Sequence, residues 1–446
     1  MDKNLLHDIN IKLKKKGVTE SDVVYFQSET ISASSRLGKL EKTEKSEVRE
    51  IGIRAIINHR QSIISSTNLE KKNVDSLIDK VVDMAKFVPQ DKFCGLAKEK
   101  QIFNEKSDNL KKLDQFDLFT PCENDLEESV LLLENSALQN KRITNSEGAE
   151  IACTKNKFLL MASNSLTQEF EKTHSDYIVA VLAENSKSME REYDYKSKVF
   201  FKDLGDFREI GQKVSKKAVK KLNSKKVKTC KTNVIFDSRV SSSLLGNLFN
   251  ACNSSTIIRG TSFLKNMIGK KLFNPQINIV DNPRLKGKLR SRISDCEGIE
   301  SNEKHLVRDG KLQFFFNCLS TARQLKDTFS GHASRGVSTL PSPSYTNLYM
   351  ENGNEKLANI IKSQKKGLLV TELMGSSINY SNGDYSRGAS GFWIENGQIA
   401  FPVSEITIAS NLNKMFKSLT PADDLEFNYG VNAPSVLIED MMVGGI

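Results

Sequence analysis

The sequence is poor in the residues that build disulfide frameworks or bind metals. Its seven cysteines are an odd number, are widely separated and include no C-x-x-C pair. Its five histidines never stand close enough to share one helical turn, and no H-E-x-x-H spacing occurs. These absences disfavour a disulfide-stabilised secreted fold and a locally encoded zinc site. We expect reduced cysteines that serve as small, half-buried hydrophobes.

Long hydrophobic runs are also missing. Runs such as 130–133 and 368–370 fall far short of the ~20 apolar residues that a membrane helix needs. The first residues, MDKNLLHDINIKLKKKG, alternate apolar and charged side chains and do not resemble a signal peptide. We therefore expect a cytoplasmic protein with no membrane partner.

Acidic residues are outnumbered, but the positive charge is local. Of a net charge of +10, most lies between Asp206 and Lys231, a segment with nine lysines and one arginine but only two acidic residues. Ile210, Val214 and Ala218 recur there every four residues while the lysines occupy another face, as in an amphipathic surface helix. The pattern predicts a solvated helix face, and we expect no nucleic-acid partner.

The pattern of the first half predicts an α+β domain with an antiparallel sheet and covering helices. A helix over 3–16 should end at Gly17, and a second should be capped by Asn73 and end before Pro89. Short strands are predicted at 23–28, 31–37, 39–45, 50–58 and 62–66. A helix over 126–138 precedes strands at 150–153, 158–163 and 175–183. We place this N-terminal domain at 1–222.

The polar, basic stretch at 223–231 predicts a linker. The residues 232–446 are predicted to form a β-rich C-terminal domain. This half contains Asp309-Gly310, Asn382-Gly383 and Asn396-Gly397, which favour tight hairpin turns. One early helix is predicted over 240–252.

Common catalytic motifs are absent. Neither the G-x-S-x-G nucleophile elbow nor a Gly-rich phosphate loop occurs. Asp295 with Glu297, and Glu372 with Asp384, could form paired carboxylates, although acid pairs are frequent in hairpin loops.

The segment 382–409, NGDYSRGASGFWIENGQIAFPVSEITIA, is rich in glycine, serine and aromatic residues. Its glycines permit close backbone approach, and its polar side chains could hydrogen-bond a peptide or a neighbouring chain. Both a well-packed hairpin and a binding surface fit this composition. The candidate residues are Gly383, Asp384, Ser386, Arg387, Gly388 and Trp393.

This segment, with the preceding TELMGSSINYS, closely resembles the signature region of the PmbA branch of the TldD/PmbA family. The resemblance continues through RGTSFLKNMIGKKLF at 259–273, INIVDNP at 277–283, SDCEGI at 294–299 and APSVLIEDMMVGG at 433–445. The N-terminal half fits more loosely, so that nearly the whole chain is covered.

The resemblance implies a pair of related cytoplasmic subunits, TldD-like and PmbA-like (TldE), that cleave unfolded peptides. The TldD-like subunit holds zinc through an H-E-x-x-x-H helix shortly before R-G-T-S, together with a C-terminal cysteine. Counting back from Arg259, the three motif positions fall on Leu245, Gly246 and Asn250. None supplies an imidazole or a carboxylate. The resemblance thus implies a subunit with no catalytic residue, no metal and no cofactor of its own.

We therefore expect a heterodimer in which a TldD-like partner supplies zinc and this chain contributes an interface or channel wall through the 382–391 loop and Trp393. Two alternatives stay open at this point. The chain could be a homodimeric peptide-binding or chaperone-like protein, or a direct modulator of DNA gyrase, a label that the family has also carried.

Overall fold

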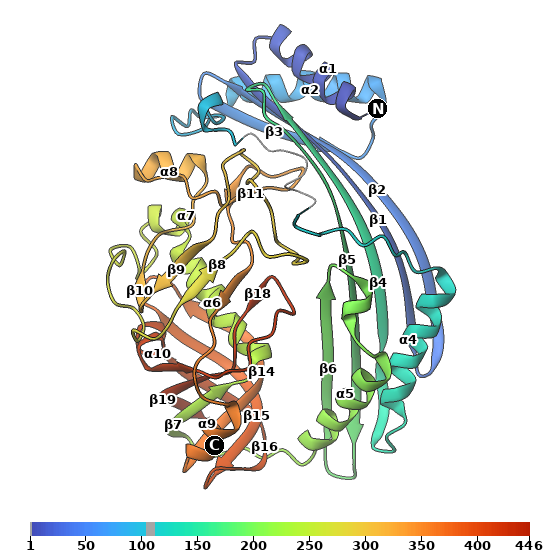
Figure 1. The fold of residues 1–446 in the computed structure, drawn as a ribbon, viewed down its shortest axis with the longest axis vertical. Helices are drawn as coiled ribbons and strands as arrows, with labels where there is room; N and C mark the ends of the chain where they lie inside the picture. Colours follow the sequence, from blue (N-terminus) through green and yellow to red (C-terminus); the bar gives the residue numbers. More distant parts are fainter. Residues whose placement is uncertain (1, 104–111) are drawn as a thin grey trace.

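The computed structural model describes residues 2–103 and 112–446 and contains two structural parts (Figure 1). A long, curved antiparallel sheet arches beside a β-rich C-terminal part, as the α+β prediction required. In the described ranges, no helix is both long and apolar enough to cross a membrane.

The N-terminal sheet has six strands in the order β3-β2-β1-β4-β5-β6. They are β1 (Glu20–Arg36), β2 (Lys39–Ile57), β3 (Arg60–Ser66), β4 (Ile143–Ala162), β5 (Thr167–Glu184) and β6 (Met189–Lys198). The prediction of many short strands was wrong. Polar stretches do not interrupt these strands because their backbones stay paired: Glu29 of β1 lies opposite Glu47 on one side and Lys155 on the other.

Among the described residues, four helices pack on one face of this sheet over two separate cores. They are α1 (Asp2–Lys15), α2 (Lys71–Phe87), α4 (Glu123–Leu138) and α5 (Phe207–Lys221), with short 3₁₀ turns at Glu99–Gln101 and Phe201–Leu204. Gly17 follows α1 with a φ of +82°, as predicted for a helix end. Asn73 does not cap α2, which begins two residues earlier; its amide instead donates to Ser66 Oγ and the Asn68 carbonyl.

The C-terminal part is built on a six-stranded sheet in the order β16-β15-β14-β7-β19-β17, and β16 also pairs with β19. These strands are β7 (Cys230–Phe236), β14 (Lys366–Asn379), β15 (Asp384–Glu395), β16 (Gln398–Asn411), β17 (Leu419–Pro421) and β19 (Val436–Gly444). A five-stranded sheet contains β8 (Ile279–Asp281), β9 (Lys304–Arg308), β10 (Lys311–Leu312), β13 (Leu348–Met350) and β18 (Val431–Asn432), and β11 (Ala333–Ser334) pairs with β12 (Ser342–Pro343). The chain passes between the two parts through the predicted linker stretch, while the exact domain limits stay a prediction.

The predicted hairpin turns are confirmed. Asp309-Gly310 and Asn396-Gly397 connect paired strands with positive φ at both residues, and Gly383 at the β14–β15 turn has a φ of +86°. The early helix is α6 (Ser238–Cys252). The described part also holds α7 (Ser254–Ile258), α8 (Leu319–Leu325), α9 (Leu357–Ser363) and α10 (Leu412–Ser418), which the sequence pattern missed because helices of one or two turns show no clear period.

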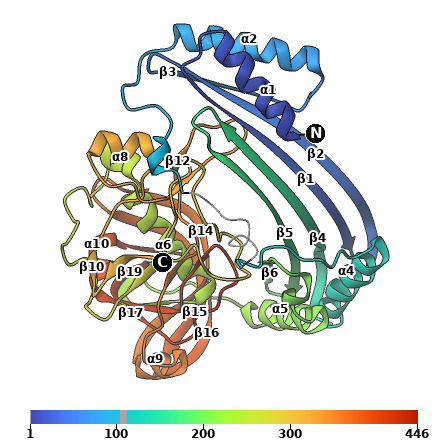
Figure 2. The same ribbon diagram turned by 45° about the horizontal axis from the view of Figure 1, so that its top comes forward.

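The curved sheet arches alongside the C-terminal part (Figure 2), and buried ion pairs join the two parts. Arg54 of β2 donates to Asp22 Oδ2 of β1 at 2.7 Å, and Arg335 from the C-terminal part contacts the other oxygen of the same carboxylate. Burial would raise the pKa of Asp22, but the two guanidinium groups hold it below its usual range. The position of the curved sheet is thus fixed by charge pairing as well as by apolar packing.

Candidate functional site on helix α6

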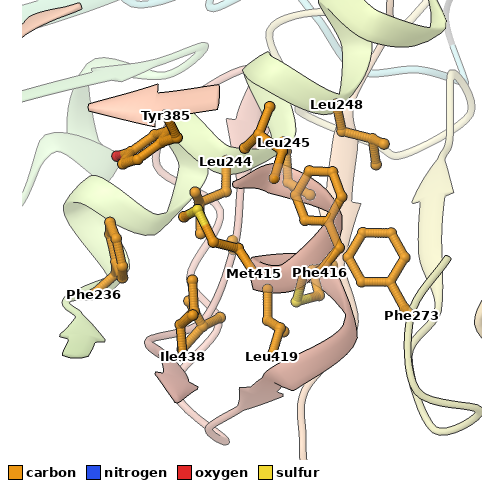
Figure 3. Packing of buried hydrophobic residues seen from close by; sticks show 14 of the residues in the cluster. Phe236, Leu244, Leu245, Leu248, Phe273, Tyr385, Met415, Phe416, Leu419 and Ile438 are labelled. Carbon is orange, nitrogen blue, oxygen red and sulfur yellow. The ribbon is translucent and has the colours of Figure 1, made fainter. Parts of the chain in front are cut away.

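Helix α6 carries Leu245, Gly246 and Asn250, the positions at which the resemblance would place the zinc motif. Asp237 caps it by accepting from the Arg239 amide, and Leu244, Leu245 and Leu248 form its apolar face. These leucines pack in the large C-terminal core, beside Met415 and Phe416 (Figure 3). Leu245 is only 1% exposed. Leu245 therefore faces the core and contributes packing.

The other two positions, Gly246 and Asn250, lie on the opposite side of the helix. A Cβ at Gly246 would meet nothing within 4 Å. Asn250 donates from Nδ2 to the Tyr380 hydroxyl at 3.0 Å, and that hydroxyl donates to Asn247 Oδ1 at 3.1 Å. The Asn247 amide nitrogen is buried without a partner in the described structure. Neutral amides and a phenol thus form a hydrogen-bonded chain here.

This hydrogen-bonded chain borders a cavity of about 600 Å³. The cavity is lined by Asn250, Thr256, Arg259, Thr261, Ile378, Asn379, Tyr380 and Ser381. Phe263 donates its backbone N–H to the Tyr380 carbonyl at 2.8 Å, which fixes the R-G-T-S segment against the β14–β15 turn. Tyr380 and Asn379 were missed as site residues, although they stand within the segment that carried the family resemblance.

The residues at this site do not fit zinc. Leu245 and Gly246 offer no donor atom, and the Asn250 amide is a poor substitute for imidazole. Within 2–103 and 112–446, no three His, Cys, Asp or Glu side chains are grouped so that they could hold a metal ion. The cavity can accept a polar ligand through amide and hydroxyl groups, but its lining offers no carboxylate or imidazole for acid–base catalysis.

The predicted loop residues lie in the β14–β15 hairpin, but none of them is among the residues that line this cavity. Arg387 donates from Nε to the Gly375 carbonyl at 2.7 Å, across the irregular pairing between Met374 and Ser377. Asp384 accepts from the side-chain amides of Asn382 and Asn411.

The other four members of the predicted set are glycines or are at least half-buried. Gly383 lies against the Asn411 side chain, which a Cβ would approach to 3.2 Å, while Ser386 and Gly388 are half-buried in β15. Trp393 is 4% exposed and packs in the core. Their role as a channel or interface stays a prediction.

The predicted acid pairs have different surroundings. Asp295 accepts backbone N–H groups of Glu297, Ile299 and Ala333, and Glu297 accepts from the Leu319 amide at 2.7 Å. Burial, with Asp295 nearby, raises the pKa of Glu297 to about 7. These contacts anchor loops in a buried environment.

Glu372 and Asp384 are separated along the β14–β15 hairpin. Glu372 lies opposite Ser390 on the neighbouring strand, whereas Asp384 lies opposite Asn379 near the turn. Glu372 binds Lys221. They therefore form no carboxylate pair.

Comparison with known proteins places this geometry in a peptidase family. Models of the PmbA/TldA metallopeptidase domain 1, central domain and C-terminal domain match residues 21–85, 119–222 and 229–445. The metalloprotease PmbA of Escherichia coli O157:H7 is 30% identical over 430 residues, which cover 95% of this chain and 92% of that protein. The chain therefore belongs to the PmbA/TldD family.

Solved structures show the same fold. A protein of Bacteroides thetaiotaomicron, named as a modulator of DNA gyrase, has a TM-score of 0.90 and 25% identity, covering 100% of this chain and 99% of its own. TldE of Thermococcus kodakarensis has a TM-score of 0.87 and 19% identity over 99% of this chain and 100% of its own. The two parts of the chain thus have the same arrangement as in these two structures.

Proposed function

We propose that this chain is the non-metal-binding subunit of a cytoplasmic PmbA/TldD-type peptidase, in which a TldD-like partner supplies the zinc and unfolded peptides are the substrate. The observation that carries the proposal is the composition of α6. A buried leucine, a glycine and an amide occupy the positions where the family motif would place two imidazoles and a carboxylate. Membership of a peptidase family supports a role in proteolysis, and these residues support a role without a metal.

The cavity beside α6 gives this subunit a function in the pair. Its hydroxyl and amide groups can hydrogen-bond the backbone of an extended peptide, which has free N–H and C=O groups, whereas a folded protein has already paired them. We expect the cavity and the β14–β15 hairpin to form part of the wall that an extended substrate contacts. The zinc-bound partner would carry out the cleavage.

The decisive experiment compares this chain alone, a TldD-like partner alone and their mixture against an unstructured peptide, with the zinc content of each recorded. We expect this chain to be metal-free and inactive alone and to raise the activity of the mixture. Stoichiometric zinc together with chelator-sensitive cleavage by this chain alone would overturn the proposal.

Arg387 provides a test of the hairpin. Replacing it with alanine removes the hydrogen bond to the Gly375 carbonyl and should lower peptide cleavage by the mixed subunits while leaving the melting temperature of this chain within a few degrees. Lys366→Ala, on the same hairpin, is the control. Full activity of the Arg387→Ala mixture would remove the hairpin from the proposed substrate path.

The basic residues of helix α5 give little support to the alternative of direct action on DNA gyrase. Lys221 is buried in ion pairs with Glu192 and Glu372, and Lys217 is half-buried, so the basic residues of α5 do not form one exposed stripe. Retention of this chain on DNA that weakens steeply with salt would favour the alternative. A peptide-binding homodimer would be favoured by a stable dimer that binds peptide without a TldD-like partner.

A further inference from the structure

A second cavity lies where α5 meets the C-terminal sheet. It has a volume of about 480 Å³ and is bordered by α5, the start of α6 and strands β14–β16. This cavity is separate from the one beside α6, since the two share no lining residue. Its wall contains four basic side chains, Lys217, Lys220, Lys221 and Arg239, against two acidic ones, Glu192 and Asp237.

Two of these basic groups are already compensated. Lys221 lies 2.6 Å from Glu192 and 2.9 Å from Glu372, and Arg239 lies 2.7 Å from the other oxygen of Glu192. Arg239 also donates to the carbonyls of Tyr193 and Thr371. These contacts form a closed network, which leaves neither group free to bind a ligand.

Lys217 differs from its neighbours. It is half-buried, and in the described part of the chain its ammonium has no hydrogen-bond or ion-pair partner. Burial, followed by the charge of Arg239, lowers its pKa. The charges of Asp194 and Asp237 oppose this shift without pairing directly with the ammonium, and an anion in the cavity would give it a direct partner.

The cavity also offers a neutral polar group and an apolar surface. The Thr371 hydroxyl is buried and has no partner among the described residues. Leu369, Phe392 and Ile399 line the cavity as well, and Ile399 is 50% exposed although it is a large apolar side chain. A charged end and an apolar wall in one cavity favour a ligand that has a charged group at one end and an apolar body.

We propose that this cavity binds an apolar carboxylate, with the carboxylate paired to Lys217 and hydrogen-bonded by the Thr371 hydroxyl, and the hydrocarbon body packed on Leu369, Phe392 and Ile399. This chemistry is found at the C-terminus of a peptide that ends in an apolar residue and in a free aliphatic acid. The inference does not depend on zinc or on a partner subunit, because every contact comes from this chain.

The test is calorimetric titration of the full chain with three probes. The probes are N-acetyl-alanyl-leucine with a free carboxylate, the same dipeptide as its C-terminal amide, and 4-methylpentanoate. We expect the free dipeptide to bind at least about tenfold more tightly than the amide, because the neutral amide cannot form the hydrogen-bonded charge pair with Lys217. Equal affinity for the two dipeptides, or no detectable binding of any probe, would overturn the proposal. Binding of 4-methylpentanoate as tight as the free dipeptide would identify a free acid as sufficient, and weaker binding would identify the peptide terminus.

Substitutions in the cavity test which side chains contact the ligand. Lys217→Met keeps the length and apolar stem of the side chain and should weaken binding of the free dipeptide about tenfold or more, while Lys213→Met, an exposed position on the same helix, should not change it. Thr371→Val provides a second, independent variant and should weaken binding severalfold. Unchanged affinity in folded Lys217→Met would show that the ammonium does not bind the ligand.

Discussion

Lys221 of α5 lies 2.9 Å from Glu372 of β14, so that an ion pair joins the N-terminal sheet domain to the C-terminal sheet. The same ammonium lies 2.6 Å from Glu192 of β6, and Lys221 and Glu192 side chains are 6% and 1% exposed. The contact connects β6 and α5, which are near each other in the sequence, to β14, which is far from both. Because these groups are shielded from water, the pairing affects stability far more than a surface ion pair does.

Lys221→Met should destabilise the protein by about 3 kcal/mol, because Glu372 loses its cation in a largely buried environment and Glu192 keeps only Arg239. Urea unfolding followed by circular dichroism measures this change. Lys226→Met is the control, since Lys226 pairs with Glu405 at the surface and its loss should leave the unfolding midpoint almost unchanged. Equal midpoints for the two variants would contradict a stabilising role for the buried pair.

Gly246→Ala should stabilise the protein by about 0.5–1 kcal/mol, because alanine lowers the entropy of the unfolded chain and its Cβ meets open space on α6. Gly211→Ala on α5 is the matched contrast. A Cβ there would lie 2.3 Å from the Leu133 carbonyl oxygen, so this variant should be destabilised by about 1–3 kcal/mol. Thermal unfolding of both variants decides the point, and destabilisation by Gly246→Ala would show that the motif face of α6 is not open.

Tyr380→Phe should destabilise the protein by about 1 kcal/mol, because the variant removes the hydroxyl that accepts from Asn250 and donates to Asn247. Tyr349→Phe serves as control, since the Tyr349 hydroxyl forms no hydrogen bond within the described structure. Chemical denaturation of the two variants gives the difference. A Tyr380→Phe midpoint equal to that of the wild type would mean that the hydroxyl does not hold the hairpin turn against α6.

Glu297 should make the protein less stable as the pH rises through about 7. Its folded-state pKa is raised above the ordinary value of 4.5, first by burial and then by Asp295, so the folded state holds a proton that the unfolded state has released. The stabilisation is complete below pH 4.5 and is lost as the pH passes 7. Glu297→Gln should flatten the decline in unfolding free energy between pH 5 and 8, measured by urea titration at each pH. An unchanged slope in the variant would assign the dependence to other groups.

The hairpins were predictable because their turns are encoded by adjacent residues. Asp309-Gly310 and Asn396-Gly397 adopt the positive φ values that the turns require, whatever surrounds them. Strand lengths were not predictable in this way. The polar middle of β1 reads as a break in the sequence, but Glu29 is paired on both sides by strands from other parts of the chain.

The sequence by itself determined the chemistry of α6, since no fold can supply imidazoles or a carboxylate at positions occupied by Leu245, Gly246 and Asn250. Only the tertiary structure decided which polar groups are buried together. Lys217 and Lys221 are four residues apart and look alike in the sequence, yet Lys221 meets Glu192 and Glu372 whereas Lys217 faces a cavity without a partner in the described chain. The physical reason is that pairing and desolvation depend on distances between strands and helices that are remote along the chain.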